Sequence, residues 1–344
     1  MSERKGDDTN AGLLAPVEPA NELMAWQALN LALNRALAAD DAVFVLGEDV
    51  GLYGGNYRVT QGLVAKYGEW RVRDAPISEN SFTGLGVGAA LVGGRPVIEI
   101  MTVNFALLAL DAIVNMAAKM RYMSGGQLKV PLVVRMPGGV AHQLAAQHSQ
   151  RLEHTLMNVP GLRLVSPATV QDHYWQLTQA VAADDPVVIL EHELLYFHSG
   201  AFSDGAEPPP MHAAVVRRQG ADFTLIAYSR MVEVALAAAD TLAGEGIDCE
   251  VVDLRSLRPM DLVALQDSVA KTHRALIVEE DCRFAGAGAE IAAALNEVAF
   301  FELEAPVARV AGADVPTPYN GELEAASIPR SADVAEAVRE WAVS

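Results

Sequence analysis

The stretch LMAWQALNLALNRALAADDAVFVLGEDVG, residues 23–51, sets the fold class of the first half of the chain. Its first part repeats apolar residues every three or four positions, which predicts a helix that Asn21 caps and that ends near Ala39. The run 42–46 then predicts a buried strand, which stops at Gly47 before a polar, glycine-rich turn. A helix followed directly by a buried strand is typical of α/β proteins.

The same alternation continues along the chain. Strand-like apolar runs follow at residues 97–101, 132–135, 162–165 and 187–190, with helix-like stretches between several of them. This order predicts a largely parallel sheet flanked by helices. A second set of strand-like runs, 224–228, 249–254 and 275–279, surrounds helical runs such as 232–243 and predicts a second, smaller α/β domain.

The segment SGAFSDGAEPPPM, residues 199–211, separates the two sets. Its three consecutive prolines cannot continue a helix or a central strand. A chain of 344 residues also exceeds the usual size of one hydrophobic core. We therefore predict a flexible N-terminal arm at 1–20, a first domain at 21–198, a linker at 199–214 and a second domain at 215–344.

Composition narrows the class of function. The formal charge of −19 opposes nonspecific attraction to nucleic acids and anionic membranes. No uninterrupted apolar run approaches the roughly 20 residues that span a bilayer as a helix. The first twenty residues lack the apolar core of a secretory signal, and two cysteines give neither a disulfide framework nor a zinc spacing. We expect a cytoplasmic protein without a nucleic-acid or membrane partner.

Several short motifs fail as signatures of other functions. The glycine run after ALIVEED lacks the third glycine of a dinucleotide fingerprint, and no GxxxxGK[ST] phosphate loop occurs. His142 and His148 have no third metal ligand at helical spacing, and Ser149 has no GxSxG elbow. Gly84, Gly86 and Gly88 indicate close backbone contact with a neighbouring helix or subunit.

Several longer motifs carry a family resemblance. They are FVLGEDVGLYGG at 44–55, DAPISENSFTGLGVGAA at 74–90, MTVNFALLALDAIVNMAAK at 101–119, YMSGGQ at 122–127 and AAQHSQ at 145–150. In this order they resemble the β subunits of pyruvate dehydrogenase E1. DFTLIAYSRMVEVALAAADTL at 222–242 and VVDLRSLRPMDL at 251–262 resemble the C-terminal domain shared with transketolases. The resemblance covers about residues 20–340. It implies a two-domain transketolase-like α/β fold with an N-terminal pyrimidine-binding domain.

The resemblance also implies an activity and partners. Members of this family decarboxylate a 2-oxo acid, here pyruvate, and transfer the acetyl group to the lipoyl arm of an E2 acyltransferase. Their cofactor is thiamine diphosphate, whose diphosphate and magnesium are held by the α subunit of an α2β2 heterotetramer. This chain lacks the GDG motif of that subunit, so it is expected to receive only the aminopyrimidine ring. The resemblance places E2 contacts on the second domain, including VARVAGADVPTPYN at 307–320.

Three residues match the family's site, and a fourth is a candidate. Glu79 matches the glutamate that bonds the aminopyrimidine, Phe105 an aromatic beside that ring, and His148 the active-site histidine. Glu48 either lines the same pocket or caps the following turn. The structural alternatives are a helix-start acid for Glu79, an ordinary core residue for Phe105 and a hydrogen-bonded structural histidine for His148.

A second set of positions aligns with a structural potassium site of some relatives: Leu132, Ala180, Val181, Ala183 and Asp185. Ala183 departs from the acid that such relatives often carry. Leu108 likewise departs from a glutamine of some relatives, which concerns the cofactor pocket.

Rival functions use the same motifs. The β subunits of acetoin dehydrogenase and of branched-chain 2-oxo acid dehydrogenases look similar, although MTVNF and YMSGGQ favour the pyruvate branch. A rival of another class is a non-catalytic scaffold that binds E2. Intact Glu79 and His148 argue against that scaffold.

Overall fold

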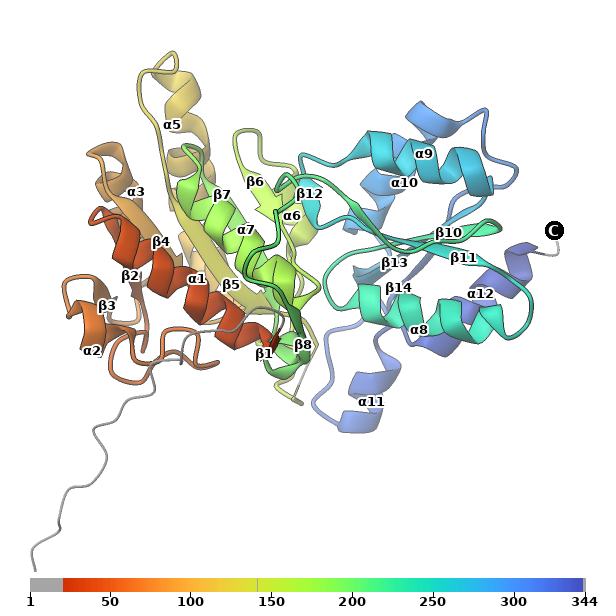
Figure 1. The fold of residues 1–344 in the computed structure, drawn as a ribbon, viewed down its shortest axis with the longest axis horizontal. Coiled ribbons are helices and arrows are strands. Elements are labelled where there is room, and N and C mark those ends of the chain that lie inside the picture. Colours follow the sequence, from red (N-terminus) through yellow and green to blue (C-terminus); the bar gives the residue numbers. More distant parts are fainter. Residues whose placement is uncertain (1–20, 141, 343–344) are drawn as a thin grey trace, which may run out of the picture.

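The computed structural model describes residues 21–140 and 142–342, so the predicted arm at 1–20 lies outside the described residues. Two sheets organise the described chain (Figure 1). A seven-stranded sheet has the order β12-β6-β7-β5-β4-β2-β3, and a five-stranded sheet has the order β14-β13-β10-β11-β9. Most neighbouring strands are parallel, as the alternation of helices and strands predicts.

The first domain contains the elements up to β8. They are β1 (Asn21–Met24), α1 (Ala25–Ala39), β2 (Val43–Gly47), α2 (Leu63–Tyr67), β3 (Val72–Asp74), α3 (Glu79–Leu91), β4 (Arg95–Glu99), η1 (Val103–Phe105), α4 (Ala106–Leu110), η2 (Asp111–Ala117), α5 (Ala118–Met123), β5 (Val133–Gly138), α6 (Glu153–Met157), β6 (Arg163–Val165), α7 (Val170–Ala182), β7 (Val187–His192), η3 (Glu193–Phe197) and β8 (Ser199–Phe202).

The second half of the chain contains the remaining elements. They are β9 (Val215–Arg218), β10 (Phe223–Ala227), α8 (Met231–Ala243), β11 (Cys249–Asp253), β12 (Ser256–Arg258), α9 (Leu262–Thr272), β13 (Ala275–Cys282), α10 (Ala287–Ala299), β14 (Ala308–Gly312), α11 (Gly321–Ala326) and α12 (Ser331–Ala342). One of them crosses back, because β12 pairs antiparallel with β6 and forms the edge of the first sheet (Figure 1). The two domains therefore share a sheet as well as a linker.

The predicted start of the first helix is wrong by three residues. Residues 21–24 form β1, which pairs antiparallel with β8 in a separate two-stranded sheet, and the helix begins at Ala25. The cap position belongs to Met24. Residues 21–24 become a strand because they pair with β8, which lies about 180 residues later in the sequence. A local sequence pattern cannot predict a contact over that distance. The first four residues of the predicted linker are thereby ordered as a strand.

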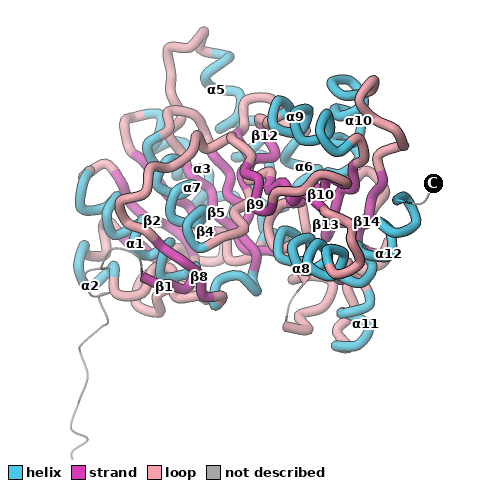
Figure 2. The backbone as a smooth tube through the Cα atoms, turned by 45° about the vertical axis from the view of Figure 1, so that its right-hand side comes forward, coloured by secondary structure: helices cyan, strands magenta, loops and turns pink. Residues whose placement is uncertain are grey.

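The strands of both sheets are buried on two faces, with helices on either side (Figure 2). In the first sheet, successive residues alternate between two apolar clusters: Ile98, Val134 and Leu190 face one, and Val97, Val133 and Ile189 face the other. The first cluster continues into the second domain through Ile226, Val252 and Ile277. Near-continuous apolar strand runs are the consequence of this two-sided burial.

One helical stretch, Val103–Met123, is long and apolar enough to cross a membrane by length and composition alone, with a mean hydropathy of 1.4. Asp111, Lys119 and Arg121 interrupt it. In the structure, 44% of its apolar window is buried, and α3 packs against it. A core helix of a globular protein passes the same test, and packing against α3 covers part of this stretch.

Candidate functional site

The carboxyl ends of four neighbouring strands define the candidate site. Strand β2 lies parallel between β3 and β4, and β4 lies parallel to β5. Glu48 follows β2, Glu79 follows β3, Phe105 follows β4 and His148 follows β5. Ligands of open α/β sheets bind at this edge, because the loops that leave parallel strands gather there. The fold therefore brings the four predicted residues to one edge of one sheet.

The turn after β2 is built tightly against the end of β3. The Gly51 amide donates to Asp74 Oδ1 at 2.6 Å, and a Cβ on Gly51 would lie 2.5 Å from Asp74 Oδ2. Only glycine permits so close an approach. This contact fixes the loop that follows Glu48 against the segment that leads to Glu79.

Glu79 is the first residue of α3, and only 2% of its surface is exposed. Its position at a helix start suits a negative charge. Among residues 21–140 and 142–342, no side-chain hydrogen bond or ion pair involves Glu79. Neither carboxyl oxygen is fully enclosed, so both can accept a hydrogen bond from a group outside the chain.

Glu48 lies beside Glu79. Burial is the main cause that raises the pKa of Glu48, and the charges of Glu79 and Asp49 add to it, while the Ser78 amide opposes the rise. Its Oε1 is buried and has no partner within the described part of the chain. Glu48 is thus in contact with the Ser78 amide at the start of α3 and close to Glu79, and its role as pocket wall or as cap of the following turn stays a prediction.

Phe105 and His148 form the other pair. Their rings meet edge to face with centroids 5.3 Å apart. Phe105 is half-buried at the end of η1, whereas His148 is exposed in a loop. An edge-to-face contact holds the imidazole without using its nitrogens, so they remain available for proton transfer.

The potassium positions are already engaged by protein groups. The Arg95 guanidinium donates to the carbonyls of Val181 at 2.9 Å and Ala183 at 3.1 Å. The carbonyls of Ala180 and Leu132 accept backbone amides, and the Asp185 carboxylate pairs with Arg121 and Arg163. A guanidinium thus supplies positive charge to two of the five predicted ligands, and the set as it stands does not fit a potassium ion.

Sequence reasoning missed two amides that hold the His148 loop, Asn104 and Gln150. Asn104 Nδ2 donates to Gln150 Oε1 at 2.8 Å and, at 3.4 Å, to the Ala146 carbonyl. The backbone N–H of Gln150 donates to Asn104 Oδ1 at 3.3 Å. Amides in such pairs leave no spacing pattern, although their places beside Phe105 and His148 are a usable signal.

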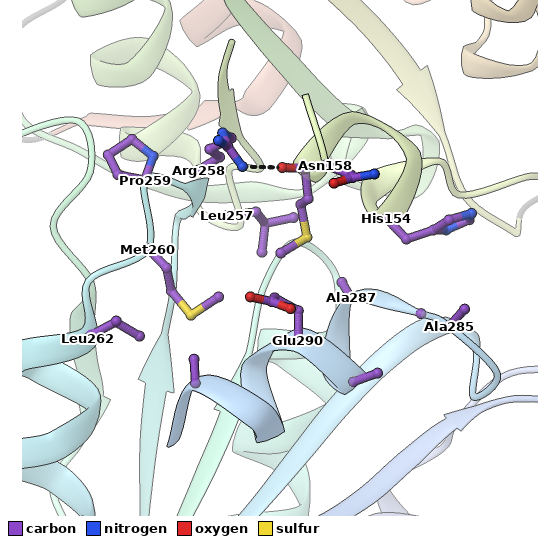
Figure 3. Close-up of a pocket in the computed structure, with 14 residues that line it drawn as sticks. His154, Asn158, Leu257, Arg258, Pro259, Met260, Leu262, Ala285, Ala287 and Glu290 are labelled. Atoms are coloured by element: carbon purple, nitrogen blue, oxygen red, sulfur yellow. Dashed lines mark hydrogen bonds between the residues drawn. The ribbon is translucent and has the colours of Figure 1, made fainter. Parts of the chain in front are cut away.

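A cavity of about 540 Å³ lies elsewhere, between α6 and α10 (Figure 3). His154 and Asn158 line it from the first domain, and Glu290 from α10. None of the four candidate residues lines this cavity. The catalytic hypothesis therefore rests on the sheet edge and not on this cavity.

Comparisons with known proteins agree with this architecture. The family described as "Transketolase, pyrimidine binding domain" matches residues 21–198, and "Transketolase, C-terminal domain" matches residues 212–334. A pyruvate dehydrogenase E1 component subunit beta of Rickettsia felis is 47% identical over 313 residues, which cover 91% of this chain and 96% of that protein.

More distant relatives extend the likeness. The mitochondrial subunit beta-1 of Arabidopsis thaliana is 47% identical over 92% of this chain and 89% of that protein. A solved structure of a split-gene transketolase, described as an inactive beta4 tetramer, superposes with a TM-score of 0.76 at 25% identity. It covers 93% of this chain and 98% of that one.

Proposed function

Because this chain belongs to the family of pyruvate dehydrogenase E1 β subunits, with the two domains of the transketolase fold, we propose that it is the β half of an enzyme that decarboxylates pyruvate and passes the acetyl group to a lipoyl carrier. The observation that carries the proposal is the buried carboxyl of Glu79, which has no protein partner within the described residues and lies beside Glu48. Such a group fits a cofactor ring that bears a protonatable nitrogen.

Thiamine diphosphate, when bound, supplies the electron sink that a 2-oxo acid needs to lose carbon dioxide. Glu79 would hold a proton at N1′ of the aminopyrimidine, because its carboxyl oxygens are free of protein donors in the described chain. Glu48, whose pKa is raised by burial and by the charge of Glu79, would line the same pocket beside Glu79. Phe105 would pack beside the ring, and His148 would move protons during acyl transfer.

An α subunit would complete the site. Among residues 21–140 and 142–342, no group of three or more His, Cys, Asp or Glu residues could hold a metal ion. We propose that the α subunit supplies the diphosphate and magnesium half of the site. Large apolar side chains are also exposed in the segments that follow β2, β3 and β4: Leu52, Tyr53, Ile77, Leu107 and Leu108. We propose that the α subunit covers them, because exposed apolar surface marks protein interfaces.

A lipoyl-bearing E2 would dock on the second domain. Val315 and Tyr319, in the predicted E2 segment, are 55% and 74% exposed. The same segment touches the His148 loop, where Thr317 Oγ1 and the Ser149 carbonyl are 3.5 Å apart. A carrier bound there would approach His148. The cytoplasm, where reduced cysteines persist, is the proposed compartment.

Reconstitution of this chain with its α subunit and an E2 tests the proposal. We expect turnover with pyruvate, and much less with branched 2-oxo acids or acetoin. Preference for either alternative substrate would move the chain to a sister branch of the family. Binding of E2 without turnover of any of the three substrates would support the scaffold.

Calorimetry tests the shared site separately. The chain alone should bind thiamine diphosphate weakly, because the phosphate and magnesium half of the site is supplied by another subunit. Tight, magnesium-dependent binding by the isolated chain would contradict the shared site.

Thermal unfolding tests the potassium site. The thermal midpoint of the chain should be equal in KCl and in NaCl, because Arg95 already donates to the Val181 and Ala183 carbonyls. A higher midpoint in KCl would support potassium binding at these positions.

A further inference from the structure

Glu280, in β13 of the second domain, contacts the start of the loop that carries His148. One carboxylate oxygen, Oε1, accepts the Val140 amide at 2.6 Å. The other, Oε2, lies 2.9 Å from His192 Nε2. Nδ1 of His192 accepts the Leu194 amide at 3.1 Å, so the ring proton of a neutral His192 is on Nε2 and points at Glu280. Each oxygen of Glu280 therefore has its own donor.

The two ends of the His148 loop are joined at this point. The Gly139 amide, next to Val140, donates to the Gln150 carbonyl at 3.1 Å, two residues beyond His148. Gln150 in turn bonds Asn104, the neighbour of Phe105. A path of direct contacts thus runs from Glu280 to both members of the Phe105–His148 pair.

The backbone of this segment needs external support. His142, Gln143 and Ala145 have φ angles of 57°, 57° and 64°, in the left-handed region that non-glycine residues avoid. Such conformations persist only where surrounding contacts fix them. Gly139, at φ 98°, has no room for a side chain: a Cβ would lie 2.3 Å from His192 Nε2 and 2.9 Å from Glu280 Oε1. The contact between Glu280 and the loop is therefore tightly packed.

Glu280 is also charged at neutral pH. Burial alone would raise its pKa, but His192, Arg151 and the Val140 amide together hold the pKa of Glu280 below its usual range. Burial lowers the pKa of His192, and the Glu280 carboxylate opposes that fall. A charged acceptor makes shorter and stronger hydrogen bonds than a neutral one.

We propose that Glu280 is a positioning residue, through which the second domain anchors the His148 loop and keeps the imidazole against Phe105. The proposal rests on the proposed role of His148 in acyl transfer. It adds that Glu280, a residue of the second domain that lies away from the sheet edge, affects the rate of acetyl transfer.

The test uses Glu280→Gln in the complex reconstituted with the α subunit. Glutamine keeps the shape but can accept only one of the two hydrogen bonds, so either Val140 or His192 loses its acceptor. The matched control is Glu250→Gln. Glu250 is equally buried in the second domain and also has two partners, Ser268 and Lys271, but it does not touch the loop. A second, independent variant is Gly139→Ala. Its added methyl group would collide with His192 and Glu280 and would push the loop away from Glu280.

Three readouts separate positioning from general stability. Amide hydrogen exchange in residues 142–150 should quicken by about tenfold in Glu280→Gln but not in the control. Acetyl transfer to lipoyl groups should slow by about 10- to 100-fold, since small misplacements of a reacting group have effects of this size. Decarboxylation with an artificial electron acceptor, which bypasses the lipoyl step, should stay within about twofold of wild type.

Unchanged loop exchange together with unchanged acetyl transfer would overturn the proposal, as would an equal loss of both activities in Glu280→Gln and Glu250→Gln. The double variant with His148→Ala should be no slower in transfer than His148→Ala alone, because both changes act on one group. If His148→Ala itself transfers acetyl groups normally, the role of His148 fails. Loop exchange then decides separately whether Glu280 anchors the loop.

Discussion

Two buried polar regions of this molecule differ in how their charges are paired. At the sheet edge, Glu79 and Glu48 are buried side by side with few protein partners. Between the domains, Asp172 at the start of α7 binds Arg255 at 2.7 Å and also Arg217, which itself binds Asp253 at 2.7 Å. Burial would raise the pKa of Asp172, but the two guanidinium groups outweigh it and lower that pKa.

The difference indicates what each region does. A set of opposite charges that pair with one another holds the domains together, because every removal leaves an unpaired charge inside the protein. A set left open to outside partners is available to a ligand and contributes little to the stability of the chain by itself. Substitutions in the cluster between the domains should therefore reduce stability, and substitutions at the sheet edge should reduce catalysis.

The largest effect is expected for Asp172→Asn. It removes the charge that Arg217 and Arg255 share, and it should destabilise the protein by about 3–5 kcal/mol. Complexes that still assemble should keep nearly normal turnover. The control is Asp240→Asn, since Asp240 is 79% exposed, lies 3.9 Å from Arg218 and should contribute at most about 1 kcal/mol. Equal thermal midpoints of the two variants would show that the cluster is not a domain clamp.

Glu79→Gln should reduce catalysis and leave stability nearly unchanged, which is the opposite of the result expected for Asp172→Asn. It keeps size but cannot exchange a proton, so kcat should fall by at least about 100-fold. Exchange of the cofactor C2 hydrogen for deuterium should slow in parallel, while the thermal midpoint stays close to wild type. Glu233→Gln, a first-turn acid of α8, is the matched control for an ordinary helix-start role. Near-normal C2 exchange in assembled Glu79→Gln would refute the assignment.

A narrower effect is expected for His148→Ala. Acetyl transfer to lipoyl groups should slow by roughly 10- to 100-fold, because proton transfer by a positioned histidine has at least this size of contribution. The measurement is transfer in the full complex, with the artificial-acceptor rate as reference. His142→Ala, a second exposed histidine of the same loop, is the control. Wild-type transfer in His148→Ala would make His148 a structural residue.

The smallest effect concerns Glu193, a buried carboxyl group between the two regions. Burial raises its pKa from 4.5 to about 7, while a hydrogen bond from Tyr57 opposes the rise. The folded state thus binds this proton more tightly than the unfolded state, so stability falls as pH rises from about 4.5 to 7. Glu193→Gln avoids that loss and should stabilise the protein by on the order of 1–2 kcal/mol at pH 8, with little gain at pH 5.

Thermal midpoints at the two pH values check this, with exposed Glu297→Gln as control. A gain of equal size at both pH values would mean that Glu193 does not titrate in this range.

Sequence patterns predicted the parallel strands well, because apolar runs such as 97–101 and 187–190 report burial on both faces. They did not predict β1 or β12, short strands whose partners lie far away in sequence. For the site, family motifs pointed to Glu79, Phe105 and His148, and the structure places these residues at one sheet edge. The ionic cluster of Asp172 and the anchor Glu280 had no motif. Two acids next to the buried run ALIV, Glu279 and Glu280, were the available signal for the latter.

The crossing of β12 has a consequence for how this protein is made. Residues 256–258 supply the outermost strand of the first sheet, beside β6. While the polypeptide emerges from the ribosome, all the other strands of that sheet are available well before this one. Nascent chains shorter than about 260 residues therefore expose the free edge of β6, and an exposed strand edge invites pairing with other chains. A truncated protein that ends at the three prolines, residues 208–210, would keep the edge of β6 unpaired permanently.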